Sequence, residues 1–468
     1  MNLRKIFLLG LCCLLTTSLS LAQNSAITPE VLQKIKSFNK ETPADQALRN
    51  AIFATDINQL AADHMNIANF DTYFSNKVNV KSVSDQKSSG RCWLFTGLNV
   101  LRSQIIAKQH FNADFELSQN YLFFYDQLEK ANLFLQAMID NKDKTMDDKT
   151  VEWLFKNPIG DGGQFTGVAD LITKYGVVPK TIMPETNSSN KTSQMSNLLS
   201  LKLREFGLEL RKMNNAKDKQ IVQKMENKKL EMLGEIYHIL TLNLGIPPTT
   251  FTYTMKEKDG KPISSKQYTP QSFFKEFCDT DFANFVMVMN DPNRDYYKVY
   301  EIEYDRHTYD GNNWKYLNLP MEEIAKIGIA SIKDSTAMYF SCDVGKFLNR
   351  DKGYLDANNF NYASLMGTTF NMNKKERIAT FASGSSHAMT LCAVDLDENG
   401  NPKKWMVENS WGASYGYNGC LIMTNDWFNE YMFRLVADKK YIAADILKYL
   451  NQKPIMLPPW DPMFINEE

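Results

Sequence analysis

The hydrophobic pattern of the chain changes near residue 250, and this change constrains the fold more than any other feature. Before it, apolar residues recur at three- and four-residue intervals, as in helices, for example from Cys92 to about Lys108. After Phe251, short β-like runs alternate with loops, as in Phe285 to Met289 and Trp405 to Val407. A helix-rich first half followed by a strand-rich second half favours an α+β fold over an alternating α/β fold.

One part of the helical half differs from the rest in composition. Residues from about 190 to 244 are rich in Lys and Glu, with Leu and Ile at helical spacing, and Gly245 and Pro247 end the run. We expect a helical insertion there. A second helix is expected from Gln119, with Ser118 as its N-cap.

The first residues have the pattern of a signal peptide. A basic start from Asn2 to Lys5 precedes an apolar run from Ile6 to Leu15, and Ser20-Leu21-Ala22 forms a small-x-small cleavage site. We therefore expect a signal peptide over residues 1–22, a mature chain over 23–468, and export to the periplasm or the outside of the cell. The apolar run is too short to span a bilayer comfortably. The alternative is an uncleaved anchor or a lipid on Cys12 or Cys13, although Leu11 does not fit the lipoprotein pattern.

Charge and cysteine content narrow the functional classes. A formal net charge of -1 gives no electrostatic argument for nucleic acid or an anionic membrane as a partner. Cleavage after Ala22 leaves five cysteines, and an odd number in an exported protein suggests a reactive thiol. Their spacing matches no zinc pattern, so we expect neither metal nor cofactor. These cysteines are Cys92, Cys278, Cys342, Cys392 and Cys420.

Cys92 is the strongest candidate for a nucleophile. It follows the Ser88-Ser89-Gly90 turn at the predicted start of a helix, where free backbone N–H groups and the helix dipole favour a thiolate. Gln86 lies six residues earlier, and its amide can form an oxyanion hole together with the backbone N–H of Cys92. Taken alone, such a cysteine is more often a small buried core residue packed beside a tryptophan.

Two later segments supply partners for such a thiol. His387 opens a β-like run behind Gly384-Ser385-Ser386, a rigid position that suits a general base. Asn409 can orient the imidazole by accepting a hydrogen bond from it, and Trp411 would cover that bond. Taken singly, His387 could be structural and Asn409 could belong to a turn. The order of Gln86 with Cys92, then His387, then Asn409 favours catalysis.

These three segments resemble the papain-type cysteine peptidases, and further motifs narrow the resemblance to the bleomycin hydrolase and aminopeptidase C branch. The motifs span nearly the whole mature chain. They are Gly90-Arg91-Cys92-Trp93-Leu94-Phe95, Glu116-Leu117-Ser118, Tyr121-Leu122-Phe123-Phe124, Asp161-Gly162-Gly163-Gln164, Lys174-Tyr175-Gly176-Val177-Val178-Pro179, Cys342-Asp343-Val344-Gly345-Lys346 and Leu457-Pro458-Pro459-Trp460-Asp461-Pro462-Met463.

The resemblance implies a papain-like fold, with a helical left part, a β-sheet right part and helical insertions. It implies that Cys92, His387, Asn409 and Gln86 are catalytic, and that Gly162, Gly163, Trp411 and Glu468 bind substrate. The tail, residues 457–468, would lie in the cleft, where its terminal carboxylate meets the free amine of a peptide. We therefore expect a secreted aminopeptidase that assembles as a homo-hexamer. The alternatives are an endopeptidase of the same fold, or a non-catalytic relative that binds peptides or nucleic acid.

Overall fold

The structure is a computed structural model that describes residues 26–80, 84–109, 115–256 and 261–463. The chain divides into two compact units, residues 1–61 and 62–468, a division that the sequence did not indicate. The predicted signal peptide, residues 1–22, lies outside the described residues. Within those residues, no helix is long and apolar enough to cross a bilayer.

The described part of the first unit consists of three short helices. Two of them begin with a proline behind a threonine cap, because proline fits the first helical turn and the threonine oxygen accepts an N–H of that turn. Neither of these two helices buries a residue within the described chain. The three helices are α1 (Pro29–Phe38), α2 (Pro43–Ala54) and α3 (Ile57–Ala61).

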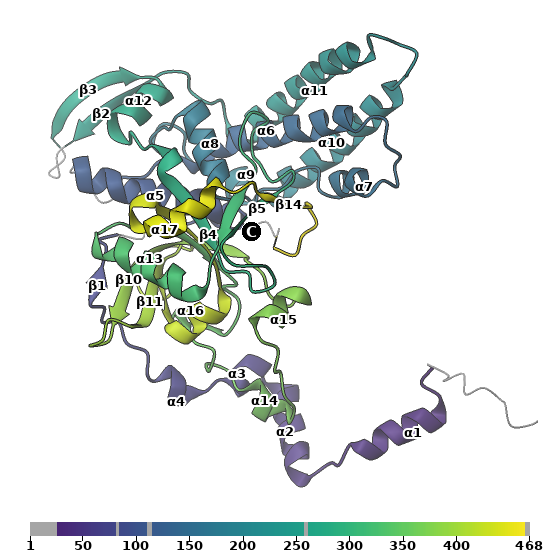
Figure 1. The fold of residues 1–468 in the computed structure, drawn as a ribbon, viewed down its shortest axis with the longest axis vertical. Coiled ribbons are helices and arrows are strands. Elements are labelled where there is room, and N and C mark those ends of the chain that lie inside the picture. The colour runs from purple at the N-terminus through teal and green to yellow at the C-terminus, as the bar shows by residue number, and fades with distance from the viewer. Residues whose placement is uncertain (1–25, 81–83, 110–114, 257–260, 464–468) are drawn as a thin grey trace, which may run out of the picture. The chain divides into compact units, whose positions relative to one another are not determined.

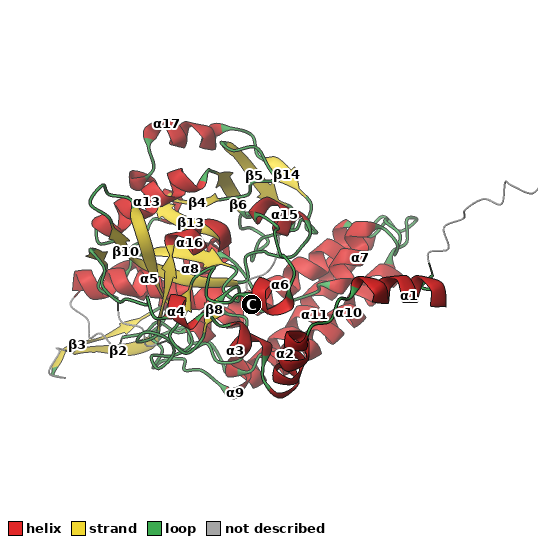
Figure 2. Ribbon diagram, turned by 90° about the horizontal axis from the view of Figure 1, so that it is seen from below, coloured by secondary structure: helices red, strands yellow, loops and turns green. Residues whose placement is uncertain are grey.

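The second unit begins with a helical part built around α6. Ser118 caps this helix by accepting the Tyr121 N–H at 3.0 Å, as predicted, and α5, α8, α10 and α11 all pack against it. Figures 1 and 2 show α6, α10 and α11 side by side. Its helices are α4 (His64–Ile67), α5 (Cys92–Gln109), α6 (Gln119–Asp140), α7 (Lys149–Lys156), α8 (Phe165–Tyr175), α9 (Asn187–Asn190), α10 (Ser193–Met213) and α11 (Ile221–Leu244).

The range predicted as a helical insertion contains the pair α10 and α11. The second of these helices ends at Leu244, and Gly245 follows with φ of +90°, a backbone conformation that glycine adopts without steric cost. Gly176 ends α8 in the same way, with φ of +72°. The predicted helix end at Gly245 and the end of α8 at Gly176 therefore both rest on the special backbone freedom of glycine.

Within the described residues, eleven strands of the strand-rich half and one strand from the helix-rich half form a twelve-stranded sheet. Its strand order is β14-β5-β6-β4-β13-β7-β10-β11-β12-β9-β8, with β1 paired to β10. The strands are β1 (Asn76–Lys77), β4 (Phe285–Met289), β5 (Lys298–Ile302), β6 (Lys315–Asn318), β7 (Met338–Cys342), β8 (Leu348–Asn349), β9 (Tyr354–Leu355), β10 (His387–Leu396), β11 (Pro402–Glu408), β12 (Cys420–Thr424), β13 (Met432–Asp438) and β14 (Ile455–Leu457).

The remaining elements cover this sheet or extend from the helical part. A separate hairpin joins β2 (Phe251–Lys256) to β3 (Pro262–Tyr268). The other helices are α12 (Pro270–Phe277), α13 (Met321–Lys333), α14 (Tyr362–Met366), α15 (Lys374–Ala379), α16 (Asn425–Tyr431) and α17 (Ala444–Leu447), with 3-10 turns η1 (Phe282–Asn284), η2 (Lys439–Tyr441) and η3 (Lys448–Asn451).

The central strand β10 links the two parts of the second unit. Helices α5 and α13 both pack against it, and its first nine residues are buried. Burial on both faces explains the continuous apolar run that follows His387 in the sequence. The structure thus confirms the predicted α+β fold, with helices before residue 250 and the large sheet after it.

Candidate active site

Cys92 is the first residue of α5. The carbonyl of Arg91 accepts the N–H groups of Leu94 and Phe95, each at 3.0 Å, which starts the helix. The amide of Cys92 is therefore one of the N–H groups that a helix leaves without a partner inside the helix. Together with the helix dipole, this position favours a thiolate over a thiol. The side chain is fully buried, so charges around the sulfur are weakly screened.

The strand that begins with His387 contacts this sulfur through its second residue. The Ala388 N–H donates to Sγ of Cys92 at 3.5 Å. His387 opens β10, where it pairs with Cys342 of β7, so the strand start is held in the sheet. The predicted nucleophile and the predicted base therefore come from two elements that pack directly together, α5 and β10.

Asn409 orients the imidazole. Its Oδ1 is 2.8 Å from Nε2 of His387 and also accepts the Ser410 N–H at 2.8 Å. With a proton on Nε2, the imidazole leaves Nδ1 as the nitrogen that can face the sulfur. The ring of Trp411 lies over the imidazole, with the ring centres 4.8 Å apart and the planes at 31°. Trp411 thus packs against His387 beside the His387–Asn409 bond, which supports the predicted covering role.

Gln86 is held between the two halves of the site. Its Oε1 accepts the hydroxyl of Ser410 at 2.6 Å, and its backbone N–H donates to the Ser410 carbonyl at 2.8 Å. One N–H of its amide donates to the Ser89 carbonyl at 2.7 Å, within the loop that leads to Cys92. An amide nitrogen carries two N–H groups, so the second can serve a substrate oxyanion.

The Gly162-Gly163 turn packs against the nucleophile helix. The indole N–H of Trp93 donates to the carbonyl of Asp161 at 2.8 Å. A Cβ on Gly163 would lie 2.7 Å from Cε2 of Trp93 and would also overlap the ring of His307. Position 163 therefore requires glycine because of close packing.

A buried polar cluster supports this turn from behind. His307 is 2.5 Å from Asp126 through Nδ1, and Lys130 donates to the Gly162 carbonyl at 2.6 Å. Burial, reinforced by the charge of Lys130, lowers the pKa of His307 below its ordinary value despite Asp126. Burial alone would raise the pKa of Asp126, but Lys130 and His307 lower it overall. The cluster thus combines a Lys130–Asp126 ion pair with the His307 ring, and it holds the turn in place.

The tail is anchored on the end of the sheet at which His387 lies. Asp461 forms an ion pair with Arg294, and Arg434 donates to the carbonyl of Met463 at 2.9 Å. Arg434 pairs with Ser341 of β7, next to the residue that pairs with His387. With strands about 4.8 Å apart, two strand spacings place Arg434 roughly 10 Å from β10. Glu468 and the other residues after Met463 lie outside the described residues, so their predicted place in the cleft stays a prediction.

The structure brings the segments of Cys92, His387, Asn409 and Gln86 together, with Trp411 against His387, and their catalytic roles stay a prediction. The Gly162-Gly163 turn is joined to the same helix through Trp93. Among the residues that the structure describes, no group of three or more His, Cys, Asp or Glu side chains could hold a metal ion. The arrangement has the parts that acyl transfer requires: a thiol at a helix start, an oriented base and oxyanion donors.

Two polar contacts that support the site were not identified from the sequence, one hydrogen bond and one ion pair. Ser410 binds Gln86, and the buried ion pair of Arg102 with Glu408, at 2.8 Å, ties α5 to the end of β11 just before Asn409. Burial raises the pKa of Glu408 to about 7, even with Arg102 beside it. The sequence did contain a signal for this ion pair, because Arg102 and Glu408 are charged residues inside otherwise apolar segments. Such residues are rarely buried without a partner.

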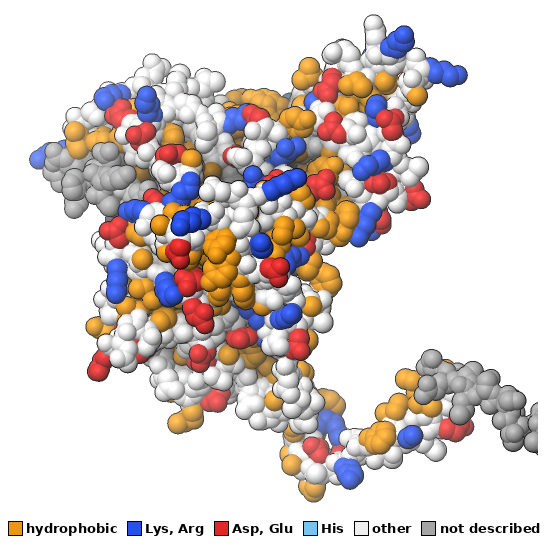
Figure 3. Space-filling model, viewed as in Figure 1, with side chains coloured by type: hydrophobic (Ala, Val, Ile, Leu, Met, Phe, Trp, Pro, Cys, Tyr) orange, Lys and Arg blue, Asp and Glu red, His pale blue; other side chains and the backbone are white. Residues whose placement is uncertain are grey.

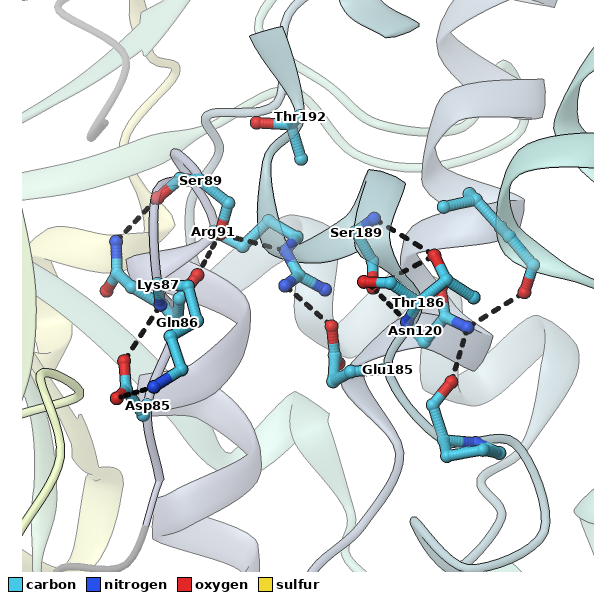
Figure 4. Close-up of polar contacts among 12 residues, drawn as sticks. Asp85, Gln86, Lys87, Ser89, Arg91, Asn120, Glu185, Thr186, Ser189 and Thr192 are labelled. Carbon is cyan, nitrogen blue, oxygen red and sulfur yellow. Dashed lines mark hydrogen bonds and ion pairs between the residues drawn. The ribbon is translucent and has the colours of Figure 1, made fainter. Parts of the chain in front are cut away.

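The segment before Cys92 also has partners far away in the chain. Figure 4 shows Arg91 and Ser89 facing the stretch from Glu185 to Thr192, which leads into α10. The guanidinium of Arg91 is fully buried and forms an ion pair with Glu185 at 2.7 Å. The helical insertion is therefore attached directly to the nucleophile loop.

Comparison with known proteins identifies the family. The profile of the Peptidase C1-like family matches residues 26–464. Aminopeptidase C of Lactobacillus delbrueckii subsp. lactis is 35% identical over 442 residues, which cover 93% of this chain and 98% of that protein. Bleomycin hydrolase of Mus musculus is 40% identical over 394 residues, which cover 82% of this chain and 86% of that protein.

A solved structure agrees with these relatives. The crystal structure of PepW from Lactobacillus rhamnosis superimposes with a TM-score of 0.90 at 37% identity, covering 94% of this chain and 99% of that one. These comparisons confirm the predicted papain-like fold and the predicted likeness to the bleomycin hydrolase and aminopeptidase C branch. The chain belongs to the Peptidase C1-like family and is a cysteine-type peptidase.

Proposed function

We propose that this protein is an exported aminopeptidase in which Cys92 and His387 form a thiolate–imidazolium pair. One observation carries the chemical part: the amide of Ala388 contacts Sγ of Cys92 at 3.5 Å, while His387 is oriented by Asn409 at 2.8 Å. A nucleophile, a base and an orienting group thus meet in one buried place, which is the arrangement that covalent catalysis requires.

The reaction follows from these positions. The thiolate of Cys92 attacks the peptide carbonyl, and the charge that develops on its oxygen is stabilised by the Cys92 N–H and the second amide N–H of Gln86. His387 gives its proton to the leaving amine, which breaks the peptide bond and leaves a thioester on Cys92. His387 then takes a proton from water, the hydroxide attacks the thioester, and the thiolate of Cys92 leaves as the acid product is released, which restores the thiolate–imidazolium pair.

Removal of single N-terminal residues is supported by the anchored tail. Asp461 and Met463 are held at the end of the sheet where His387 lies, so the described part of the tail ends near the proposed site. A terminal carboxylate in the cleft would block long substrates and favour a free amine. The names of the relatives, aminopeptidase C and bleomycin hydrolase, agree with this specificity.

Export and assembly rest on the N-terminal residues. The signal-like start supports secretion, with Gln23 as the first mature residue. Homo-oligomerisation is supported by α1, where Val31, Ile35 and Phe38 follow helical spacing and are 39%, 47% and 73% exposed. Figure 3 shows hydrophobic side chains on the surface of these N-terminal helices. Such a stripe is expected to be covered by another subunit, as in the proposed hexamer.

The central test compares one peptide with a free N-terminus and the same peptide N-acetylated, with the products analysed by mass spectrometry. We expect loss of single residues from the free peptide only, and no turnover with Cys92→Ala. Internal cleavage of both peptides would indicate an endopeptidase, and binding without cleavage would indicate a non-catalytic relative. Turnover retained in Cys92→Ala would refute the chemistry.

Two further measurements test the remaining parts of the proposal. N-terminal sequencing of protein from its native host should begin at Gln23, and a chain that still begins at Met1 in the cytosol contradicts export. Light scattering of the mature protein should give six subunits, and Phe38→Glu should lower that number. A monomer at high protein concentration would contradict the proposed assembly.

A further inference from the structure

Asp161 joins three parts of the structure at the nucleophile loop. One carboxylate oxygen, Oδ2, accepts the backbone N–H of Gly90 at 2.8 Å, and the hydroxyl of Thr192 donates to the same oxygen. The carbonyl of Asp161 accepts the indole N–H of Trp93 at 2.8 Å. One residue therefore connects the loop before Cys92, the Gly162-Gly163 turn and the start of the helical insertion.

The fit between Asp161 and Gly90 is close. A Cβ on Gly90 would lie only 2.5 Å from Oδ1 of Asp161, so any other residue there would push the carboxylate away. Gly90 is buried, and its N–H makes a charge-assisted hydrogen bond, about twice as strong as a neutral one. The glycine thus allows an acidic side chain to hold the loop by its backbone.

The neighbouring residues are tied in the same direction. Arg91 lies between the rings of Phe95 and Phe123, 5.2 Å from each centre, and pairs with Glu185. The Ser88 N–H donates to the carbonyl of Asn190 at 3.0 Å. The loop from residue 88 to 91 is therefore bound by Asp161 through Gly90. It is also bound by the segment that leads into α10, which Figure 4 shows beside Arg91.

The same loop carries the donors of the proposed oxyanion hole. Gln86 reaches Ser89 through its amide, and Cys92 follows Gly90 by two residues. The spacing of consecutive Cα atoms is fixed at about 3.8 Å. A shift of Gly90 is therefore passed along this short loop to Gln86 on one side and to Cys92 on the other. A misplacement of about 1 Å at a reacting centre can reduce the rate roughly 100-fold.

We propose that Asp161 is a positioning residue that holds the nucleophile loop so that the Cys92 N–H and the Gln86 amide converge on the substrate carbonyl. This inference rests on the proposed peptidase function. The thiolate–imidazolium pair depends instead on the packing of α5 against β10 and on Asn409. Removal of the Asp161 carboxylate should therefore reduce hydrolysis much more than it reduces the reactivity of the Cys92 thiol.

The test measures two reactions on the same variants. Hydrolysis of a free-amine peptide requires the oxyanion donors, whereas alkylation of Cys92 by iodoacetamide requires only the thiolate. We expect Asp161→Ala to lower kcat about 100-fold while the alkylation rate changes by only a few fold. Asp161→Asn retains an oxygen that can accept the Gly90 N–H, so it should lose about fivefold or less.

Two controls separate positioning from general destabilisation. The first control is Asp63→Ala. Like Asp161, Asp63 accepts backbone N–H groups through its carboxylate, from Met65 and Asn66 at 3.0 Å each, but it does not lie in the loop before Cys92. This variant should keep full activity. Thr192→Val removes only the hydroxyl donor and should give an intermediate loss of kcat. It also provides the test if Asp161→Ala does not fold.

The outcomes are distinct. Hydrolysis within threefold of wild type in both Asp161→Ala and Thr192→Val would overturn the inference, as would equal losses of hydrolysis and alkylation. An active wild type that loses activity in Cys92→Ala shows that the proposed function itself holds. Failure of the function and failure of the positioning role are therefore distinguishable.

Discussion

Release of the C-terminal tail should change which peptides the enzyme accepts. The change that tests this is Asp461→Ala. Asp461 is 6% exposed, forms an ion pair with Arg294, and accepts the Met463 N–H at 2.9 Å. Its loss should free the last residues from the end of the sheet without altering Cys92 or His387.

The size of the effect follows from the contacts removed. A hydrogen bond to a charged group contributes about 1.5–3 kcal/mol and a neutral one about 0.5–1.5 kcal/mol. Burial raises the pKa of Asp461, and the Met463 N–H and Arg294 partly offset this rise. The buried carboxylate therefore has a desolvation cost, which reduces the net free energy contributed by its two contacts. A net loss of about 3 kcal/mol corresponds to a rise of roughly 100-fold in the equilibrium constant between the released tail and the bound tail. Arg294 keeps its pair with Asp291, so its own position at the end of the sheet should be retained.

The assay is the ratio of initial rates on N-acetylated and free forms of one peptide. We expect this ratio to rise by about 10- to 100-fold in Asp461→Ala, and to rise at least as far when residues 464–468 are deleted. Asp445→Ala, which removes an exposed carboxylate from α17, should leave the ratio unchanged. If the ratio stays within twofold of wild type in both the substitution and the deletion, the tail does not determine exopeptidase specificity.

Three other predictions concern buried groups. Arg102→Met or Glu408→Leu alone should destabilise the protein by about 3–5 kcal/mol in urea unfolding, and the double variant should recover most of that loss; additive losses would contradict the pairing. Burial lowers the pKa of Lys374 to about 7, so the native state binds fewer protons than the unfolded state between pH 7 and 10.5. Stability should therefore rise with pH across this window, by up to about 5 kcal/mol relative to Lys374→Met, in parallel pH series of chemical unfolding. Gly163→Ala should lower the Tm because its Cβ would overlap a buried imidazole, whereas Gly234→Ala, with open space on α11, should raise it slightly.

Local signals explain why so much of the fold and the site could be predicted. The start of α5 at Cys92, the Ser118 cap and the helix end at Gly245 each depend on a few adjacent residues. The same is true of His387 at the start of β10 and of Asn409 after β11. Short motifs with a local physical cause are readable without knowledge of the rest of the chain.

Long-range pairing could not be predicted in this way. Arg102 and Glu408 are 306 positions apart, and Gly90 and Asp161 are 71 apart. Each side chain has many possible partners, and only the packing of helix on strand selects one of them. The separation of residues 1–61 as a unit was also not visible, because a helical pattern does not show where one compact unit ends and the next begins.

The two kinds of contact have different roles in catalysis. The reactive groups are placed by local structure, but the distance between nucleophile and base depends on links between the helical part and the sheet. Three such links lie close together along the chain: Cys92 with Ala388, Gln86 with Ser410, and Arg102 with Glu408. Each joins a residue in the first quarter of the chain to one near its end. Substitution at these links should therefore reduce kcat while every residue of the catalytic motif is retained, because a small shift between two rigid parts is enough to misalign the reacting atoms.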